Sequence, residues 1–284
     1  MAVRATRIQG AVAALLPGGR LHLQHGPIDI IAEAFGEPPA VRAAYARAAS
    51  RFSTVLEDLV AELPALRAED APVSGRIARR MALAVAPFRP VFITPMAAVA
   101  GAVADEIVMA LTGPGIRRAY ANNGGDIALW LASGERLTCA LAATGGLDRV
   151  TVGASDPVRG IATSGWRGRS FSLGIADAVT VVARTAAEAD AAATMVANAV
   201  NLDHPGILRR AAREVQCDSD LGDRLVTAAV PVLTPAERAA ALRAGLQAAE
   251  DFRTRGLIEG AALFLQGEHR MTGALALEKG NASG

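Results

Sequence analysis

The chain has 284 residues, of which 51% are hydrophobic and 20% are charged. This length suits one large domain or two small ones, and the composition excludes an intrinsically disordered chain. The 29 basic and 28 acidic residues leave a net charge of +1, so we expect no broad positive field of the kind that binds nucleic acids. The two cysteines are too few for a disulfide scaffold and favour a reduced, cytoplasmic setting.

The N-terminal half combines strand and helix patterns. The predicted strands are 11–16, 20–24 and 27–34, and the predicted helices are 39–64, 74–86 and 94–111. We expect Ser74 to cap the second helix and Thr94, followed by Pro95, to cap the third. The third helix is apolar almost all round and should be buried. Its most apolar run, 96–104, is about half of the ~20 residues that cross a bilayer, so we expect no membrane partner.

The C-terminal half alternates irregularly between strands and helices. The predicted strands are 116–121, 127–131, 136–142, 149–153, 160–164, 178–183 and 257–265, and the predicted helices are 185–201 and 234–255. Both helices open on a capping-box pattern, with Thr185 before Glu188 and Thr234 before Glu237. The sequence contains neither an internal repeat nor a long linker. We therefore expect a single α+β domain that spans residues 1–284, with a mixed or antiparallel sheet packed by helices.

One helix carries its polar residues in a single row. Asp190, Thr194 and Asn198 are the only polar residues between Ala189 and Val200, and steps of four place them on one side of a helix. A carboxylate and a hydroxyl one turn apart are ligands suited to Mg²⁺. A polar stripe that faces water, or an Asp190–arginine pair, would give the same pattern, so these alternatives stay open.

Three other segments have features of a binding site. In 122–126 (NNGGD), two glycines permit positive φ and expose consecutive N–H groups to an anion, although an ordinary hairpin turn has the same composition. In 162–165 (ATSG), two hydroxyls end a strand, and Trp166 beyond them offers a stacking plane unless this is a solvated loop. Gly101 lies inside the apolar helix 94–111, where it would permit close packing or the approach of a ligand.

Taken in order, four segments resemble the ApbE-like superfamily, the fold of the FMN:protein transferases. They are 97–105 (AAVAGAVAD), 123–127 (NGGDI), 162–165 (ATSG) and 177–183 (DAVTVVA) leading to 189–194 (ADAAAT). The resemblance covers about residues 90–200. It implies an ApbE-like, T-fold-related domain in which Asp190 and Thr194 hold Mg²⁺ beside the pyrophosphate of bound FAD.

The resemblance also implies a dinucleotide site and a reaction. The residues expected to line this site, with Trp166 added as a stacking ring, are Asn123, Gly124, Gly125, Asp126, Thr163, Ser164, Gly165 and Trp166. The family reaction cleaves the pyrophosphate of FAD and passes FMN to a Ser or Thr hydroxyl of a target protein. The metal would neutralise charge on the transferred phosphoryl group.

The sequence departs from the family pattern in two places. Ala100 stands where the pattern has Lys before the glycine of the buried helix. The stretch 166–176 stands where the family carries a His-Ile-x-Asp-Pro-x-Thr-Gly loop that helps to build the flavin pocket, and it contains neither His nor Pro. The chain is therefore closer to a shorter branch of the superfamily, in which 170–174 (SFSLG) replaces the loop.

Several side chains are candidates for the base of a reaction. Asp126 and Asp105 lie in the family motifs, and His204 lies in the loop directly after the polar-striped helix, where a purely structural role is the alternative. His22 and His25 are spaced by three on a predicted strand, so they cannot share one face, and we expect no metal cluster there.

We therefore expect a protein that binds a phosphate-bearing heterocyclic cofactor, a flavin nucleotide or similar, with Mg²⁺. If the protein is an enzyme, metal-assisted phosphoryl or nucleotidyl transfer is the reaction class that fits. One alternative is a non-catalytic carrier of a flavin or pterin ring stacked on Trp166. Another is a homo-oligomeric scaffold, in which Asp190, Thr194 and Asn198 would pair with polar groups of a neighbouring subunit. The sequence leaves all three open.

Overall fold

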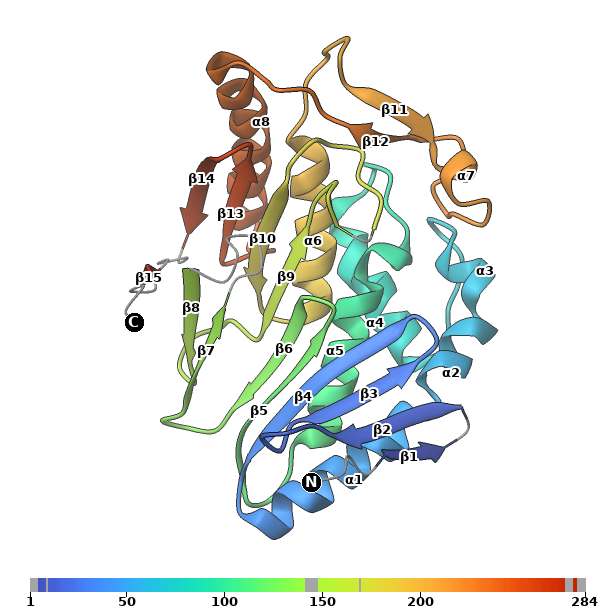
Figure 1. Cartoon of the computed structure of the whole chain (residues 1–284), viewed down its shortest axis with the longest axis vertical. Helices are drawn as coiled ribbons and strands as arrows, with labels where there is room; N and C mark the ends of the chain where they lie inside the picture. Colours follow the sequence, from blue (N-terminus) through green and yellow to red (C-terminus); the bar gives the residue numbers. More distant parts are fainter. Residues whose placement is uncertain (1–4, 9, 141–147, 169, 274–277, 280–284) are drawn as a thin grey trace.

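A large antiparallel sheet forms the body of the protein, and helices cover one of its faces (Figure 1). The computed structural model describes residues 5–8, 10–140, 148–168, 170–273 and 278–279. Ten strands pair in one sheet, and each neighbouring pair is antiparallel. The predicted α+β class with a sheet packed by helices is thus confirmed.

The elements are numbered in chain order. The large sheet consists, in spatial order, of β1 (Ala5–Ile8), β2 (Ala11–Leu15), β3 (Leu21–His25), β4 (Ile28–Gly36), β5 (Ile116–Asn123), β6 (Asp126–Leu131), β9 (Gly160–Ser164), β10 (Ala178–Ala183), β13 (Gly260–Leu265) and β14 (Glu268–Gly273). Two smaller sheets consist of β7 (Arg136–Ala140), β8 (Asp148–Gly153) and β15 (Glu278–Lys279), and of β11 (Leu208–Ala211) and β12 (Leu225–Ala229). The helices are α1 (Pro38–Phe52), α2 (Val55–Ala61), α3 (Leu63–Leu66), α4 (Arg76–Val85), α5 (Val99–Leu111), α6 (Ala186–Ala199), α7 (Ala212–Val215) and α8 (Pro235–Thr254), with 3₁₀ turns η1 (Ala86–Phe88) and η2 (Pro95–Ala98).

The middle of the large sheet is buried on both faces. On β6, Ala128 belongs to the core beneath the helices, whereas Ile127, Leu129 and Leu131 belong to a second core shared with β7 and β8. Successive residues of a strand point to opposite faces, so one strand can supply both cores. Cys139 of β7 is buried in this second core, in agreement with its alternating position along the strand.

The predicted helix 39–64 is wrong as a single helix. It breaks after Phe52, and three separate helices, α1, α2 and α3, occupy the segment. At the break, Ser53 Oγ donates to Ser50 O at 2.9 Å, and Arg51 Nη1 donates to Thr54 Oγ1 at 2.7 Å. Side-chain hydrogen bonds of Ser and Thr compete with the helical ladder, which explains why an uninterrupted apolar period did not give an uninterrupted helix.

The predicted caps have mixed outcomes. Ser74 is not a cap, because Gly75 takes the N-cap position of α4 and the Ser74 N–H donates to Glu62 Oε2. The Thr94 hydroxyl is not a cap either; it donates to Asp220, and α5 is preceded by the turn η2. Thr234 forms its complete capping box, whereas Thr185 accepts from the Glu188 N–H without the return bond. Elements that the sequence did not predict are β1, β11, β12, β14, β15, α7 and η1.

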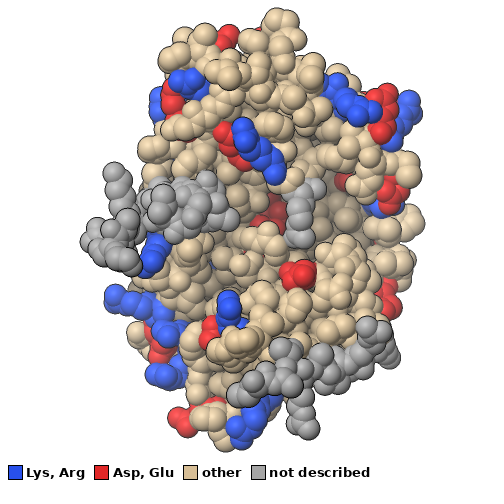
Figure 2. All heavy atoms as spheres, viewed as in Figure 1, with Lys and Arg blue, Asp and Glu red and all other residues tan. Residues whose placement is uncertain are grey.

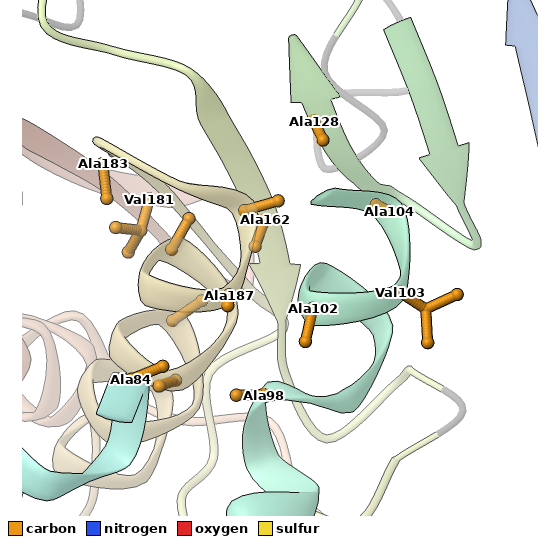
Figure 3. Packing of buried hydrophobic residues seen from close by; sticks show 14 of the residues in the cluster. Ala84, Ala98, Ala102, Val103, Ala104, Ala128, Ala162, Val181, Ala183 and Ala187 are labelled. Atoms are coloured by element: carbon orange, nitrogen blue, oxygen red, sulfur yellow. The ribbon is translucent and has the colours of Figure 1, made fainter. Parts of the chain in front are cut away.

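Small side chains allow α5 and α6 to pack closely against each other and against the sheet (Figure 3). A Cβ atom on Gly101 of α5 would lie 2.1 Å from Ala186 O, and one on Gly160 of β9 would lie 2.1 Å from Thr185 O. The first turn of α6 is therefore wedged between α5 and the start of β9. This confirms that Gly101 permits close packing.

An aspartate from each of these two helices also binds the N-terminus of the other helix. Asp105, in the second turn of α5, accepts from the N–H groups of Ala186 and Ala187 at 3.0 Å each. In return, Asp190 Oδ2, in the second turn of α6, accepts from the Gly101 N–H at 3.0 Å. The first-turn N–H groups of a helix have no partner within the helix and carry partial positive charge, so each carboxylate satisfies and stabilises the other helix's N-terminus.

A second buried carboxylate connects three helices. Glu106 of α5 is fully buried and accepts from Arg51 Nε of α1 at 2.5 Å, from Arg80 Nη1 of α4 at 3.2 Å and from Arg76. Burial opposes ionisation of Glu106, but the hydrogen bonds from Arg51 and Arg76 hold its pKa below the usual value. The cluster fixes α4 and α1 against α5.

We predict that Gly101→Ala destabilises the protein by about 2 kcal/mol or more, because the new Cβ would overlap Ala186 O at 2.1 Å and force α5 and α6 apart. Urea unfolding would measure the loss. Gly134→Ala is the matched control: its Cβ would meet nothing within 4 Å, and its φ of 81° should cost only about 1 kcal/mol. Equal losses in the two variants would contradict the packing argument.

We predict that Asp105 makes the protein less stable as pH rises. Burial raises its pKa from 3.8 to about 6, against the opposing effect of its two backbone hydrogen bonds. Because the folded state holds the proton more tightly, this contribution to stability is full below the unfolded pKa and is lost as pH rises through the folded pKa. Relative to Asp105→Asn, the wild type should lose most of about 3 kcal/mol between pH 4 and 7 in urea unfolding.

Glu106 provides a control of opposite sign, since its folded pKa is lowered. Relative to Glu106→Gln, the wild type should gain stability as pH rises through the folded pKa toward 4.5. A difference between wild type and Asp105→Asn that stays flat with pH would refute the assignment of Asp105.

Candidate functional site

The row of polar side chains on α6 is the partly exposed side of an otherwise mostly buried helix. Asp190, Thr194 and Asn198 are each partly exposed, whereas the alanines beside Asp190 and Val196 on the far side are buried. Among the residues that the structure describes, no arginine or lysine forms an ion pair with Asp190. The alternative of an Asp190–arginine pair is therefore not what the structure shows.

Asp190 lies beside a second carboxylate. Burial and the nearby Asp126 carboxylate raise the pKa of Asp190 well above its usual value, and its hydrogen bonds from the Gly101 and Ala100 N–H groups counteract this only in part. Asp126 is itself buried at the start of β6 and accepts from the Thr163 N–H at 3.2 Å. Two aspartates that raise each other's cost of ionisation are an arrangement that a cation would relieve.

The segment 122–126 is a tight hairpin turn between β5 and β6. Asn123 pairs with Asp126, and the two glycines between them have φ values of 69° and 118°. One of the N–H groups, that of Gly125, donates to Asn122 Oδ1 at 2.8 Å. Asn123 Nδ2 donates to Ala100 O at 3.1 Å and so fixes the turn to the start of α5.

The end of β9 completes this side of the site. Thr163 Oγ1 lies 2.9 Å from Thr180 Oγ1, and Ser164 follows it at the end of the strand. Gly165 is required by close packing, since a Cβ there would lie 2.5 Å from Asp177 O. Beyond it, the Trp166 indole Nε1 is buried with no hydrogen-bond partner among the described residues. The Arg167 guanidinium lies 5.2 Å from the Trp166 ring centre and pairs with Asp177.

The side chains that could hold a cation here are oxygen donors from two elements. Asp190 and Thr194 come from α6 and Asp126 comes from β6, and the Thr194 hydroxyl has no hydrogen-bond partner within the described part of the chain. No group of three His, Cys, Asp or Glu suited to a metal occurs among the described residues. A Mg²⁺ ion at this place would therefore need neutral oxygens or water as further ligands, as Mg²⁺ commonly does.

All three candidate bases have hydrogen-bond partners in the fold. Both Asp105 oxygens accept from the first turn of α6, which gives this residue a structural task. His204 Nδ1 accepts from the Gly206 N–H at 3.0 Å, and its Nε2 lies 3.5 Å from Glu237 Oε1 at the start of α8. Asp126 and Asp105 both raise the pKa of Asp190, and Asp126 has the larger effect.

Asn198 has a different role from its neighbours in the row. Its Oδ1 accepts from the Leu173 N–H at 2.9 Å, within the stretch 166–176. Leu173 O in turn accepts from Asn201 Nδ2 at 3.2 Å and from Arg209 Nη1 at 2.7 Å, and Thr227 Oγ1 donates to Gly174 O at 2.7 Å. No sequence pattern pointed to Arg209 and Thr227, because they lie on β11 and β12, two strands that were not predicted.

These contacts also bear on a scaffold role. Asp190 and Asn198 already find hydrogen-bond donors within their own chain, at Gly101 and Leu173.

Basic and acidic side chains are interspersed over the face shown in Figure 2, without a single broad patch of either sign. Within the described residues, none of the helices combines the length and the apolar character needed to cross a bilayer.

Known proteins are similar to this chain over much of its length. A family model described as AbpE bacteria matches residues 13–271. A UPF0280 protein of Methanothermobacter thermautotrophicus is 37% identical over 161 residues, which are 55% of this chain and 57% of that protein. A UPF0280 protein of Methanothrix thermoacetophila is 38% identical over 160 residues, 53% of this chain and 65% of that protein.

The chain thus spans less than two thirds of the length of these two relatives. A UPF0280 protein of Methanopyrus kandleri is 33% identical over 193 residues, which are 66% of this chain and 76% of that protein. The family match runs from β2 into β14 and includes every residue of the candidate site. The chain therefore belongs to the AbpE bacteria family and is a relative of the UPF0280 proteins.

Proposed function

We propose that this chain is an ApbE-like protein that binds a phosphate-bearing heterocyclic cofactor, a flavin nucleotide or a close analogue, together with Mg²⁺ at Asp190 and Thr194. The observation that carries the proposal is the position of Asp190, partly exposed beside Asp126 and free of any arginine partner among the described residues. A carboxylate in this setting favours a cation, and a hydroxyl one turn further along α6 is a suitable second ligand.

A second line of support is that the four motifs of the ApbE resemblance meet at one place. Asn123 donates to Ala100 O, Asp190 accepts from the Gly101 N–H, and Asp126 accepts from the Thr163 N–H. These three hydrogen bonds join segments that are separated by up to 89 positions in the chain. Chance matches to four short motifs have no reason to converge in this way.

The chain's own residues suggest a division of tasks. Asp190 and Thr194 supply oxygen ligands, and the Gly124–Gly125 turn leaves room for a ligand's approach, since a Cβ on Gly125 would meet nothing within 4 Å. Bound Mg²⁺ would neutralise phosphate charge, which is the chemistry that phosphoryl or nucleotidyl transfer requires. Asp126, adjacent to Asp190, is the residue we assign to accept a proton from an attacking hydroxyl.

A non-catalytic carrier of a flavin or pterin ring is the second candidate. It is favoured by Trp166, whose buried Nε1–H lacks a partner among the described residues and whose ring lies under the Arg167 guanidinium. A buried donor without a partner is costly, and a ring nitrogen or carbonyl of a ligand would satisfy it. The two candidates share the site and differ only in turnover.

We predict that Asp190→Asn weakens Mg²⁺ binding at least tenfold, because it removes the negative charge while one side-chain oxygen remains to accept from Gly101. Thr194→Val should weaken it less, since it removes a neutral ligand. Calorimetric titrations of Mg²⁺, and of FAD, FMN, ATP and a pterin with and without Mg²⁺, would measure this. Glu188→Gln, which changes a carboxylate outside the row on the same helix, is the control and should bind like the wild type. If Asp190→Asn and Mg²⁺ removal both leave every affinity unchanged, the metal assignment is wrong.

We predict that Trp166→Ala weakens flavin binding about tenfold or more through loss of ring stacking, whereas Trp166→Phe keeps the stacking and loses only the Nε1 hydrogen bond. Fluorescence titration with FAD in the presence of Mg²⁺ would rank the three proteins. Chromatography of the same mixtures distinguishes the two candidates. Release of AMP together with FMN, with water as the acceptor of the FMN group, indicates the pyrophosphate cleavage that transfer requires, and intact FAD retained in stoichiometric amount indicates a carrier. Full affinity in Trp166→Ala would exclude Trp166 from the site.

A further inference from the structure

A hollow lies on the face of the large sheet opposite to α5 and α6. It has a volume of about 610 Å³, which is within the range of small-molecule sites, and it lies between β4, β5 and β6 on one side and β7 on the other. Along β5, Ala119 and Ala121 face the core beneath the helices, whereas Arg118, Tyr120 and Asn122 line this hollow. Asn122 and Asn123 thus face different sites from adjacent positions.

The hollow combines an apolar floor with polar groups at its rim. Ile127 and Cys139 are buried members of the second core, and Leu137 packs against them. Glu33, Arg118 and Tyr120 supply the polar groups. An apolar floor with a few placed polar groups is the usual composition of a pocket that binds an organic molecule.

Arg118 has an unused hydrogen-bond donor. Its Nε is buried without a partner among the described residues, although its guanidinium lies 4.4 Å from the Phe35 ring centre and Nη1 donates to Arg136 O at 3.1 Å. Nη1 also forms an ion pair with Glu135 Oε2 at 3.5 Å, which leaves Nε without an acceptor among the described residues. A buried guanidinium N–H without an acceptor is rare, and an anionic oxygen is the acceptor that it prefers.

Glu33 of β4 and Tyr120 of β5 form a hydrogen-bonded pair that restricts the charge a ligand can carry in this hollow. Tyr120 Oη donates to Glu33 Oε2 at 3.1 Å, and burial together with Glu33 raises the pKa of Tyr120 to about 12. Tyr120 therefore keeps its proton in neutral solution and donates it to the Glu33 carboxylate. A second anionic group near this pair would be repelled.

We propose that this hollow is a second binding site, for a small monoanionic aromatic acid whose acid group accepts from Arg118 and whose ring rests on Ile127, Leu137 and Cys139. The site is independent of the metal-binding row, because it lies across the sheet and shares no residue with it. The inference stands whether or not the proposed function is correct.

The test uses two probes that differ only in charge, 1-naphthoate and 1-naphthamide, titrated into the ¹⁵N-labelled full chain and followed by NMR. In the wild type, 1-naphthoate should shift the amide signals of Tyr120, Asn122 and Leu137 in a saturable way. 1-Naphthamide should bind about tenfold more weakly, since it lacks the charge that Arg118 recognises. Absence of saturable shifts at these positions, or equal affinity for the two probes, would overturn the proposal.

Three variants complete the test. Arg118→Gln should abolish the preference for 1-naphthoate, whereas Arg117→Gln, a change at the neighbouring and 70% exposed side chain, should retain it. Asp190→Asn should bind both probes like the wild type, which separates failure here from failure of the Mg²⁺ assignment. A preference that survives in Arg118→Gln would overturn the proposal, and if that variant does not fold, the two probes on the wild type decide the matter.

Discussion

The arrangement of the protein depends on two reciprocal contacts between α5 and α6, in which an aspartate of each helix binds the N-terminus of the other. Asp105 of α5 accepts from the first turn of α6, and Asp190 of α6 accepts from the first turn of α5. Each helix N-terminus carries roughly half a positive charge, so each buried carboxylate has a favourable neighbour. These hydrogen bonds require the two helices to be in contact, and only glycine at position 101 leaves room for that contact. The contact fixes the position of α6, and thereby the position of the row of polar side chains on it.

The two aspartates make the same kind of contact, but they differ in whether they can also bind a ligand. Asp105 is buried and both its oxygens are bonded, so it has nothing to offer a ligand. Asp190 also accepts from backbone N–H groups, those of Gly101 and Ala100, but it remains partly exposed beside Asp126. One structural device thus yields a carboxylate that holds the fold together and another that is available for chemistry. The difference follows from position alone, since the residue type is the same.

How much the sequence could predict varies with the range of the interactions. The strands 160–164 and 178–183 have the predicted bounds, because short apolar runs between turn residues specify a buried strand. β14 was missed because it is a polar edge strand with no alternation to detect, and β11 and β12 because they are short and pair only with each other. The break after Phe52 depends on local Ser and Thr hydrogen bonds that leave the apolar period intact. In the site, the resemblance grouped Asn123, Asp126, Thr163 and Asp190. Which aspartate stays partly exposed, and the support from Arg209, depend on long-range contacts that no local pattern encodes.

The short stretch before β10 is bound from two sides, and this limits how the architecture can vary. Leu173 O is shared by Asn201, just after α6, and by Arg209 of β11, while Thr227 of β12 holds Gly174. Inserting residues here would move these acceptors away from the half-buried guanidinium of Arg209, whose partners among the described residues are neutral oxygens. Loop length and the β11–β12 ribbon are therefore constrained to change together in the evolutionary history of the fold.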